Sequence, residues 1–117
     1  MERMPEYTDG VVELYPISED TEEDQPEEYI KKSDKMTVWY RELSVFDRTK
    51  NELNQGGIEV TMKLRIPQYK KVNSKYIAIV GNEQHKVYNA AHVTSKEGFP
   101  ETELTLMTPR YKLEVRE

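Results

Sequence analysis

Acidic side chains at calcium-loop spacing are the first candidates for chemistry in this chain. Asp20, Glu22 and Asp24 are spaced like the first three ligands of an EF-hand loop. Such a loop needs glycine at its sixth position and glutamate at its twelfth, where this chain has Gln25 and Lys31. The pattern therefore predicts no EF-hand site and leaves, at most, a weak and nonspecific contact with a divalent cation.

The two histidines, His85 and His92, lie seven residues apart in one predicted strand. An odd separation places two side chains on opposite faces of a regular strand. The pair therefore cannot ligate one metal ion unless the strand contains a bulge. We expect ordinary strand histidines and no metal site.

The residues of covalent catalysis and phosphate binding are missing from the sequence. The chain has no cysteine, which excludes a thiol nucleophile, disulfides, thiolate zinc sites and iron–sulfur clusters. No serine lies in a Gly-x-Ser-x-Gly elbow, and the Gly56-Gly57 pair precedes a predicted strand rather than a helix. The sequence therefore predicts a protein that is not an enzyme and that holds no cofactor.

A basic stretch with interleaved aromatic residues is a candidate nucleic-acid surface. Its members are Arg65, Tyr69, Lys70, Lys71, Lys75 and Tyr76. Such residues can follow a phosphate backbone and stack on bases. The formal net charge of -5 argues against a dedicated nucleic-acid binder, for which a basic chain is expected.

Strict alternation of apolar and polar side chains predicts the strands that would position these residues. The alternation is clearest over residues 57–67, where Pro67 ends the ladder because it has no amide hydrogen. Residues 76–80 and 86–93 flank the turn residues Gly81-Asn82-Glu83 and predict a hairpin.

Further strands are expected at residues 10–17, 36–46, 104–106 and 111–115. Pro16 would place the first of these at a sheet edge. Only residues 48–54 have helical propensity, and they are too few to cover a sheet. We therefore predict one all-β domain over residues 1–117, a small antiparallel β-barrel of about five to seven strands with long flexible loops.

The most apolar run of the chain, residues 36–46, contains its only tryptophan, Trp39. A large aromatic side chain in such a run is expected to anchor the core. No apolar stretch approaches the roughly 18 residues that a membrane span needs, so no membrane contact is predicted.

Charge is distributed unevenly along the chain. Residues 1–34 carry a net charge of -9 and residues 35–117 a net charge of +4. Within the acidic part, residues 18–28 hold seven acids, no base and no large apolar side chain. Such a segment cannot offset its ordering entropy by burial, and we expect a mobile loop or an interaction tail.

The stretch over residues 37–108 resembles the head-closure proteins of long-tailed bacteriophages, also called head–tail joining or stopper proteins. The resemblance lies in the order and spacing of several elements. They are a Val-Trp strand (37–41), a loop with Lys50-Asn51-Glu52, a strand ending in Arg-Ile-Pro (58–67), a Lys-Tyr-Ile-Ala-Ile-Val-Gly strand and turn (75–81), a Lys-Val-Tyr-Asn strand (86–89) and Glu-Leu-Thr-Leu (103–106).

The resemblance implies a structural virion protein of the head–tail junction, assembled in the host cytoplasm. It would form a ring beneath the portal and its adaptor, retain packaged DNA and offer a surface to the tail. Members carry a long loop that points into the channel, and by order along the chain this loop corresponds to residues 47–57. The candidate channel residues are Arg48, Lys50, Glu52, Asn54 and Gln55.

The roles of these residues follow from position alone. Arg48 or Lys50 would face DNA phosphates without sequence specificity, and Glu52 would pair between neighbouring loops. A ring repeats each charge around one axis, so a modest charge per subunit becomes a dense collar.

The acidic segment departs from the family, whose barrel begins close to the N-terminus. Either residues 18–28 enlarge the first connection, or residues 1–34 form an arm that reaches a basic surface on the portal adaptor. The candidate partner residues are Glu22, Glu23, Asp24, Glu27 and Glu28.

Two alternatives stay open at this point. A tail terminator or tail-completion protein is also a small β-rich ring component and differs little in local sequence. A single-stranded nucleic-acid-binding barrel would use Lys70 and Lys71 of the basic stretch.

Overall fold

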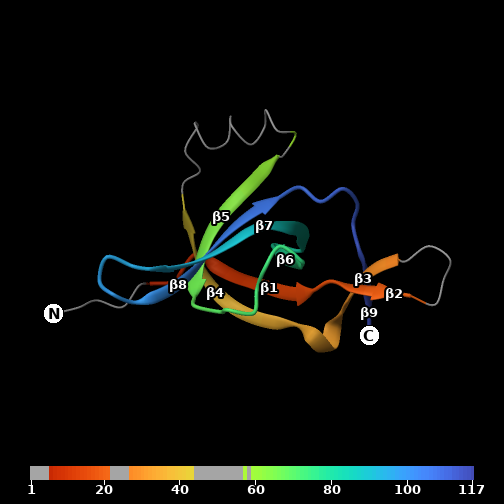
Figure 1. Ribbon diagram of the computed structural model, residues 1–117, viewed down its shortest axis with the longest axis horizontal. Helices are drawn as coiled ribbons and strands as arrows, with labels where there is room; N and C mark the ends of the chain where they lie inside the picture. The colour runs from red at the N-terminus through yellow and green to blue at the C-terminus, as the bar shows by residue number, and fades with distance from the viewer. Residues whose placement is uncertain (1–5, 22–26, 44–56, 58) are drawn as a thin grey trace.

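Strands make up nearly all of the regular structure. The structure, a computed structural model, describes residues 6–21, 27–43, 57 and 59–117. Over these residues the chain forms nine strands and one 3-10 turn (Figure 1). They are β1 (Gly10–Pro16), β2 (Ser18–Asp20), β3 (Glu27–Lys31), the 3-10 turn η1 (Lys32–Asp34), β4 (Met36–Leu43), β5 (Val60–Pro67), β6 (Tyr76–Val80), β7 (Glu83–Thr94), β8 (Pro100–Met107) and β9 (Glu114–Arg116).

Six of the strands close into an antiparallel barrel. Their order is β1-β4-β5-β8-β7-β6, and β6 pairs back onto β1. With hardly any helix to cover a sheet, closure is what buries the apolar faces of these strands. The prediction of a small antiparallel β-barrel is confirmed.

The prediction that β1 lies at a sheet edge is wrong. β1 pairs with β4 on one side and with β6 on the other. Pro16 is the last residue of the strand, opposite Tyr76, and a proline there ends the ladder without interrupting it. Val12 and Leu14 are fully buried inside the barrel.

The predicted hairpin over β6 and β7 is confirmed. Gly81 and Asn82 join the two strands and both have positive φ, 58° and 67°. Positive φ at both central residues is the conformation of a type I′ turn, which matches the twist of the flanking strands.

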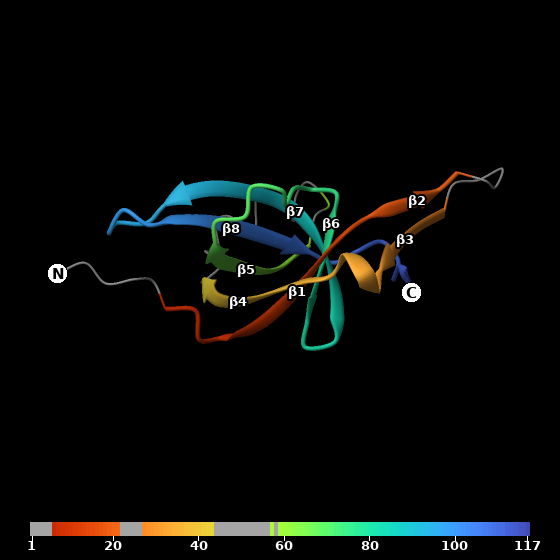
Figure 2. The ribbon, with the colours of Figure 1, turned by 90° about the horizontal axis from the view of Figure 1, so that it is seen from below.

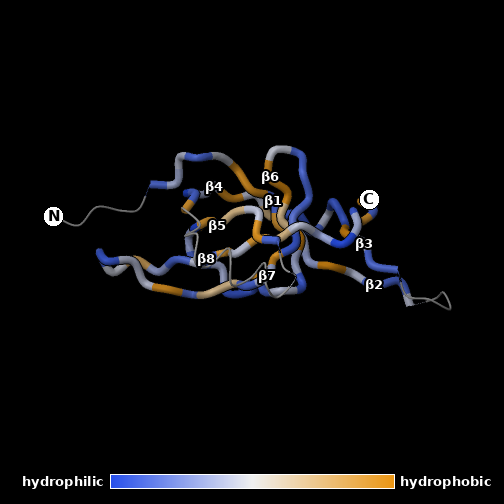
Figure 3. Tube along the Cα trace, turned by 90° about the horizontal axis from the view of Figure 1, so that it is seen from above, coloured by the Kyte–Doolittle hydropathy of each residue, from blue (hydrophilic) through white to orange (hydrophobic). Residues whose placement is uncertain are grey.

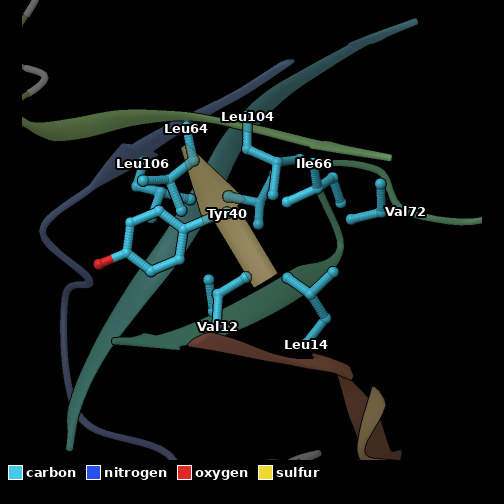
Figure 4. Packing of buried hydrophobic residues seen from close by; sticks show 10 residues of the cluster. Val12, Leu14, Tyr40, Leu64, Ile66, Val72, Leu104 and Leu106 are labelled. Atoms are coloured by element: carbon cyan, nitrogen blue, oxygen red, sulfur yellow. The ribbon is translucent and has the colours of Figure 1, made fainter. Parts of the chain in front are cut away.

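The barrel core comes from alternate residues of its strands. Leu64 and Ile66 of β5 lie beside Leu104 of the neighbouring strand β8, and all three are fully buried in one cluster. Figure 4 shows the side chain of Tyr40 pointing into the same cluster beside Leu106. The alternation predicted for residues 57–67 therefore identifies the buried face of β5.

The prediction that Trp39 anchors the core is wrong. Its side chain is 59% exposed, because β4 turns Tyr40 inward and so turns its neighbours Trp39 and Arg41 outward. Val11 of β1 lies opposite Trp39 in the register. An apolar run therefore marked the right strand but not which of its side chains are buried.

The remaining strands form a second, three-stranded sheet in the order β2-β3-β9. β2 and β3 are antiparallel, and β9 runs parallel to β3. In Figures 1 and 2 the β2–β3 hairpin extends away from the barrel, and the β7–β8 hairpin extends in the opposite direction.

The prediction of a mobile loop over residues 18–28 is wrong where the structure describes them. Ser18–Asp20 forms β2, and Glu27 and Glu28 open β3. Residues 22–26 lie outside the described part. Figure 3 shows that the hairpin becomes more hydrophilic with distance from the barrel. Its outer part is therefore stabilised by pairing with β9 and by the ion pair between Arg116 and Asp20, not by apolar burial.

A second apolar cluster joins the two sheets. Tyr15 and Ile77 lie on the outer face of the barrel, where they pack with Ile30 of β3 and with Leu113. The side chain of Leu113 is only 6% exposed. The three-stranded sheet is thus held against β1 and β6 by its own small core.

Truncation of the barrel core should destabilise the whole fold. We expect Leu104→Ala to lower the free energy of unfolding by about 2–5 kcal/mol, because a fully buried leucine leaves a cavity in the shared core. Val115→Ala, at a side chain that is 39% exposed, is the matched control and should change it by less than about 0.5 kcal/mol. Denaturant unfolding measures both, and equal losses would contradict the placement of the core.

Candidate assembly interface

The candidate channel residues lie on a connection whose two ends are fixed by the barrel. Arg48, Lys50, Glu52, Asn54 and Gln55 lie outside the described residues. The strands that flank them pair antiparallel, with Leu43 of β4 opposite Lys63 of β5. The connection therefore leaves and re-enters one end of the barrel between neighbouring strands.

The base of this connection also contacts the segment that follows β8. The backbone N–H of Thr108 donates a hydrogen bond of 3.0 Å to the carbonyl oxygen of Glu59. Thr108 is the first residue of a ten-residue segment that ends the sequence, here named the 108–117 arm. The arm therefore starts beside the base of the connection.

The described acidic candidates contact the 108–117 arm of their own chain. Glu22, Glu23 and Asp24 lie outside the described residues. Glu28 Oε1 accepts a hydrogen bond of 3.0 Å from the hydroxyl of Tyr111. Glu27 Oε2 lies 3.9 Å from Nη2 of Arg116.

Arg116 is the centre of a small charged cluster. Its Nη1 lies 3.3 Å from Oδ2 of Asp20, and its Nε lies 3.3 Å from Oε2 of Glu114. Its guanidinium carbon lies 4.0 Å from the centre of the Tyr29 ring, a cation–π contact. One arginine thus links β2, β3 and β9, which explains why strands rich in acids pair here.

The arm is fixed to β7 by an amide side chain. Gln84 Nε2 donates to the carbonyl oxygen of Leu113, and the N–H of Leu113 donates to Gln84 Oε1, both at 2.8 Å. The amide therefore satisfies the backbone of Leu113 as a neighbouring strand would, at the point where its side chain enters the second core.

A groove of about 290 Å³ lies between the arm and the barrel. Ile17, Ile77 and Lys86 line one side of it, and Pro109 and Tyr111 line the other. Burial lowers the pKa of Lys86, and the charge of Glu28 opposes that shift. The Lys86 ammonium donates to the carbonyl oxygen of Ser74. The groove is therefore mainly apolar, with the charged residues Lys86, Arg110 and Glu28 also in its lining.

A buried ion cluster on the outer face of the barrel has no counterpart in the sequence predictions. Glu101 of β8 is fully buried. Its carboxylate lies 3.1 Å from Nη2 of Arg41 and 3.4 Å from Nη1 of Arg65. Oε2 of Glu101 also accepts a hydrogen bond of 2.9 Å from the hydroxyl of Tyr7.

The cluster ties the segment before β1 to three barrel strands. Burial, followed by the hydrogen bond to Glu101, raises the pKa of Tyr7 from 10.0 to about 12. Arg65 also lies 3.6 Å from Glu103, which balances the second guanidinium. The four residues of the cluster, Tyr7, Arg41, Arg65 and Glu101, lie on separate segments. Their proximity could therefore be predicted only from the strand register.

The prediction that the two histidines lie on opposite faces is wrong. β7 contains a bulge between Val87 and Asn89, and the extra residue there shifts the alternation of faces by one. Two residues on either side of the bulge that are an odd number apart therefore lie on the same face. His85 Nδ1 lies 2.9 Å from Oγ1 of Thr61, and His92 Nδ1 lies 2.9 Å from Oγ1 of Thr102. Burial lowers the pKa of His85.

The histidines still share no site. The seven residues that separate them correspond to about 23 Å along the strand at roughly 3.3 Å per residue. Among the described residues, no three acidic or histidine side chains are grouped as metal ligands.

The aromatic residues of the basic stretch are partly buried. Tyr69 and Tyr76 pack against the barrel core, and Arg65 is engaged with Glu101. Lys70 and Lys71 are exposed beside them. Part of the surface of both tyrosines is therefore used in core packing.

Removing the buried carboxylate should strongly destabilise the protein. We expect Glu101→Gln to lower the free energy of unfolding by about 3–5 kcal/mol, because it leaves two guanidinium groups with one buried partner fewer. Glu103→Gln, at a partly exposed carboxylate, should cost markedly less. Denaturant unfolding at neutral pH compares the two, and the reverse order would contradict the cluster.

The raised pKa of Tyr7 gives the stability a pH dependence of known sign. A phenol whose pKa is higher in the folded state stabilises the fold below pH 10, and that contribution is lost as pH rises from 10 toward 12. The difference in unfolding free energy between the parent chain and Tyr7→Phe should therefore shrink over this range. A difference that grows with pH would contradict the hydrogen bond from Tyr7.

Neither membrane helices in the described residues nor related families and curated proteins were found for this chain. Within the part of the chain that the structure describes, no helix is long and apolar enough to cross a membrane. The sequence matches no protein-family model, and no curated protein matches it significantly.

Proposed function

We propose that this chain is a structural virion protein of the head–tail junction of a tailed phage, which acts as a ring and not as an enzyme. The observation that carries the proposal is the pairing of β4 with β5 in a closed barrel. The Val-Trp strand and the Arg-Ile-Pro strand are neighbours joined by one long connection, as the resemblance to head-closure proteins implies. The order of elements that suggested the family is thus compatible with one barrel.

The shape of the molecule supports assembly. The chain has a radius of gyration of 15.2 Å, against about 13 Å for a compact domain of this length. Two hairpins extend from the barrel in opposite directions (Figure 2). In a ring, such extensions increase the surface shared with neighbouring subunits, the portal adaptor and the tail protein.

Trp39 supports a contact surface as well. Trp39 is 59% exposed on the outer face of the barrel, and tryptophan is enriched where protein interfaces bind most strongly. Its neighbour Arg41 belongs to the rigid Glu101 cluster, so the strand that presents it is held in place.

The channel role is assigned to the connection between β4 and β5. In a ring its residues would repeat around one axis, and Arg48 and Lys50 would place positive charge beside DNA phosphates without reading bases. Packaged DNA would thus be retained by geometry and charge. A tail terminator is the second candidate, because the same barrel would serve it equally well.

The test is a phage lysate in which this gene is deleted and the protein is supplied in trans. Without the protein, electron microscopy should show finished tails beside tailless, leaky or empty heads. Tails of uncontrolled length would assign the protein to tail termination instead. Intact, infectious particles would contradict both roles.

Two variants supplied in the same way test the channel role. A chain in which residues 49–55 are replaced by a short Gly-Ser linker should fold and join the particle but release DNA. The matched control replaces Lys70 and Lys71 with glutamine, which removes exposed charge elsewhere and should retain DNA. Retention of DNA by both variants would refute the assigned role of the connection.

A further inference from the structure

The 108–117 arm docks through contacts that are independent of its covalent connection to the barrel. Its β9 pairs with β3, and its Leu113 fills the second core. Gln84 binds the backbone of Leu113, and Asp20 binds Arg116. Every one of these partners lies far from the arm in sequence, so the same arm from another copy would find a complete docking site.

The connection into the arm is built to change direction. Pro109 follows the hydrogen bond of Thr108 and cannot continue a ladder. No backbone hydrogen bond joins residues 109–112 to another residue in the part of the chain that the structure describes. These residues span the groove of about 290 Å³ and do not fill it. We name residues 109–112 the hinge of the arm. Rotation at the hinge would break no backbone hydrogen bond of the barrel.

The arm and its docking sheet have complementary charge. The arm carries three bases, Arg110, Lys112 and Arg116, and two acids, Glu114 and Glu117, a net charge of +1. The β2–β3 hairpin offers Asp20 and Glu27 to Arg116, and Glu28 to the Tyr111 hydroxyl. The acids of the hairpin therefore bind Arg116 by complementary charge, whichever copy supplies the arm.

We propose that the 108–117 arm is exchanged between subunits, so that each arm docks on the β2–β3 sheet of the next copy in the ring. The proposal rests on the proposed ring function and names its subunit contact. The docked part of the arm begins at Leu113, so only the five residue steps from Thr108 to Leu113 can bridge two subunits, and fully extended they span at most about 18 Å. The exchange therefore requires the docking sheet of the next copy to lie within that distance of Thr108. An exchange in one direction around a ring closes without free arms.

The absence of cysteine makes the exchange directly measurable. Tyr29 and Glu114 are partners in the β3–β9 register, at a spacing that a disulfide can bridge. In Tyr29→Cys/Glu114→Cys the two introduced thiols are the only ones in the chain. Arg116 keeps its contacts with Asp20 and Glu27 in this variant.

The variant is oxidised as dilute monomer and in DNA-filled phage heads, and then analysed by non-reducing gel electrophoresis. We expect a single monomer band from the dilute protein and a ladder of covalent multimers from the heads. The control pair Glu13→Cys/Thr37→Cys joins β1 and β4 inside one barrel and should give monomer in both samples.

The outcomes separate the exchange from the ring. Monomer bands from heads that contain the protein would overturn the exchange and leave the ring function standing. If the protein never joins the heads, the ring function fails, and the exchange in the ring fails with it. Each single-cysteine variant has one thiol per chain and should stay monomeric under the same oxidation. A disulfide-linked dimer from either would mean that chance collisions, not docked arms, form the cross-links.

Discussion

The buried carboxylate of Glu101 is the constraint on which the rest of the barrel depends. A charge without solvent is costly unless several partners meet it, and here Arg41, Arg65 and Tyr7 do so from separate segments. Slipping the register by one residue would turn Glu101 into the apolar core and its partners away from it. The cluster therefore fixes β4, β5 and β8 relative to one another, and with them the base of the long connection.

Closure of the barrel decides where a partner strand can pair. The six barrel strands have both neighbours, so the outermost strands of the described residues are β2 and β9 of the small sheet. Unpaired edges invite pairing with another chain, and short charged strands limit it. The acids of β2 and β3 and the Arg116 cluster lie at that place. Specific pairing is thereby favoured over indiscriminate aggregation.

Sequence reasoning succeeded where a pattern is local and failed where a distant partner decides. The alternation in β5 and the Gly81-Asn82 turn identify their own structure. The exposure of Trp39 depends on which face the barrel closes around, and the strands at the ends of residues 18–28 depend on Arg116, nearly a hundred residues away. Glu101 gave no local signal, since its partners meet only after three strands pair. The candidate channel residues remain a prediction.

The hydrogen bond between Thr108 and Glu59 relates the two proposed functional segments. It places the hinge of the 108–117 arm at the same end of the barrel as the base of the β4–β5 connection. Met107, the last residue of β8, lies opposite Val60, the first residue of β5. The hinge that follows β8 and the connection that precedes β5 therefore begin side by side. In a ring whose connections face one axis, every arm would then leave the barrel at a fixed position relative to that axis. Arm exchange and channel closure would therefore depend on the same pair of strands, which the Glu101 cluster holds rigid.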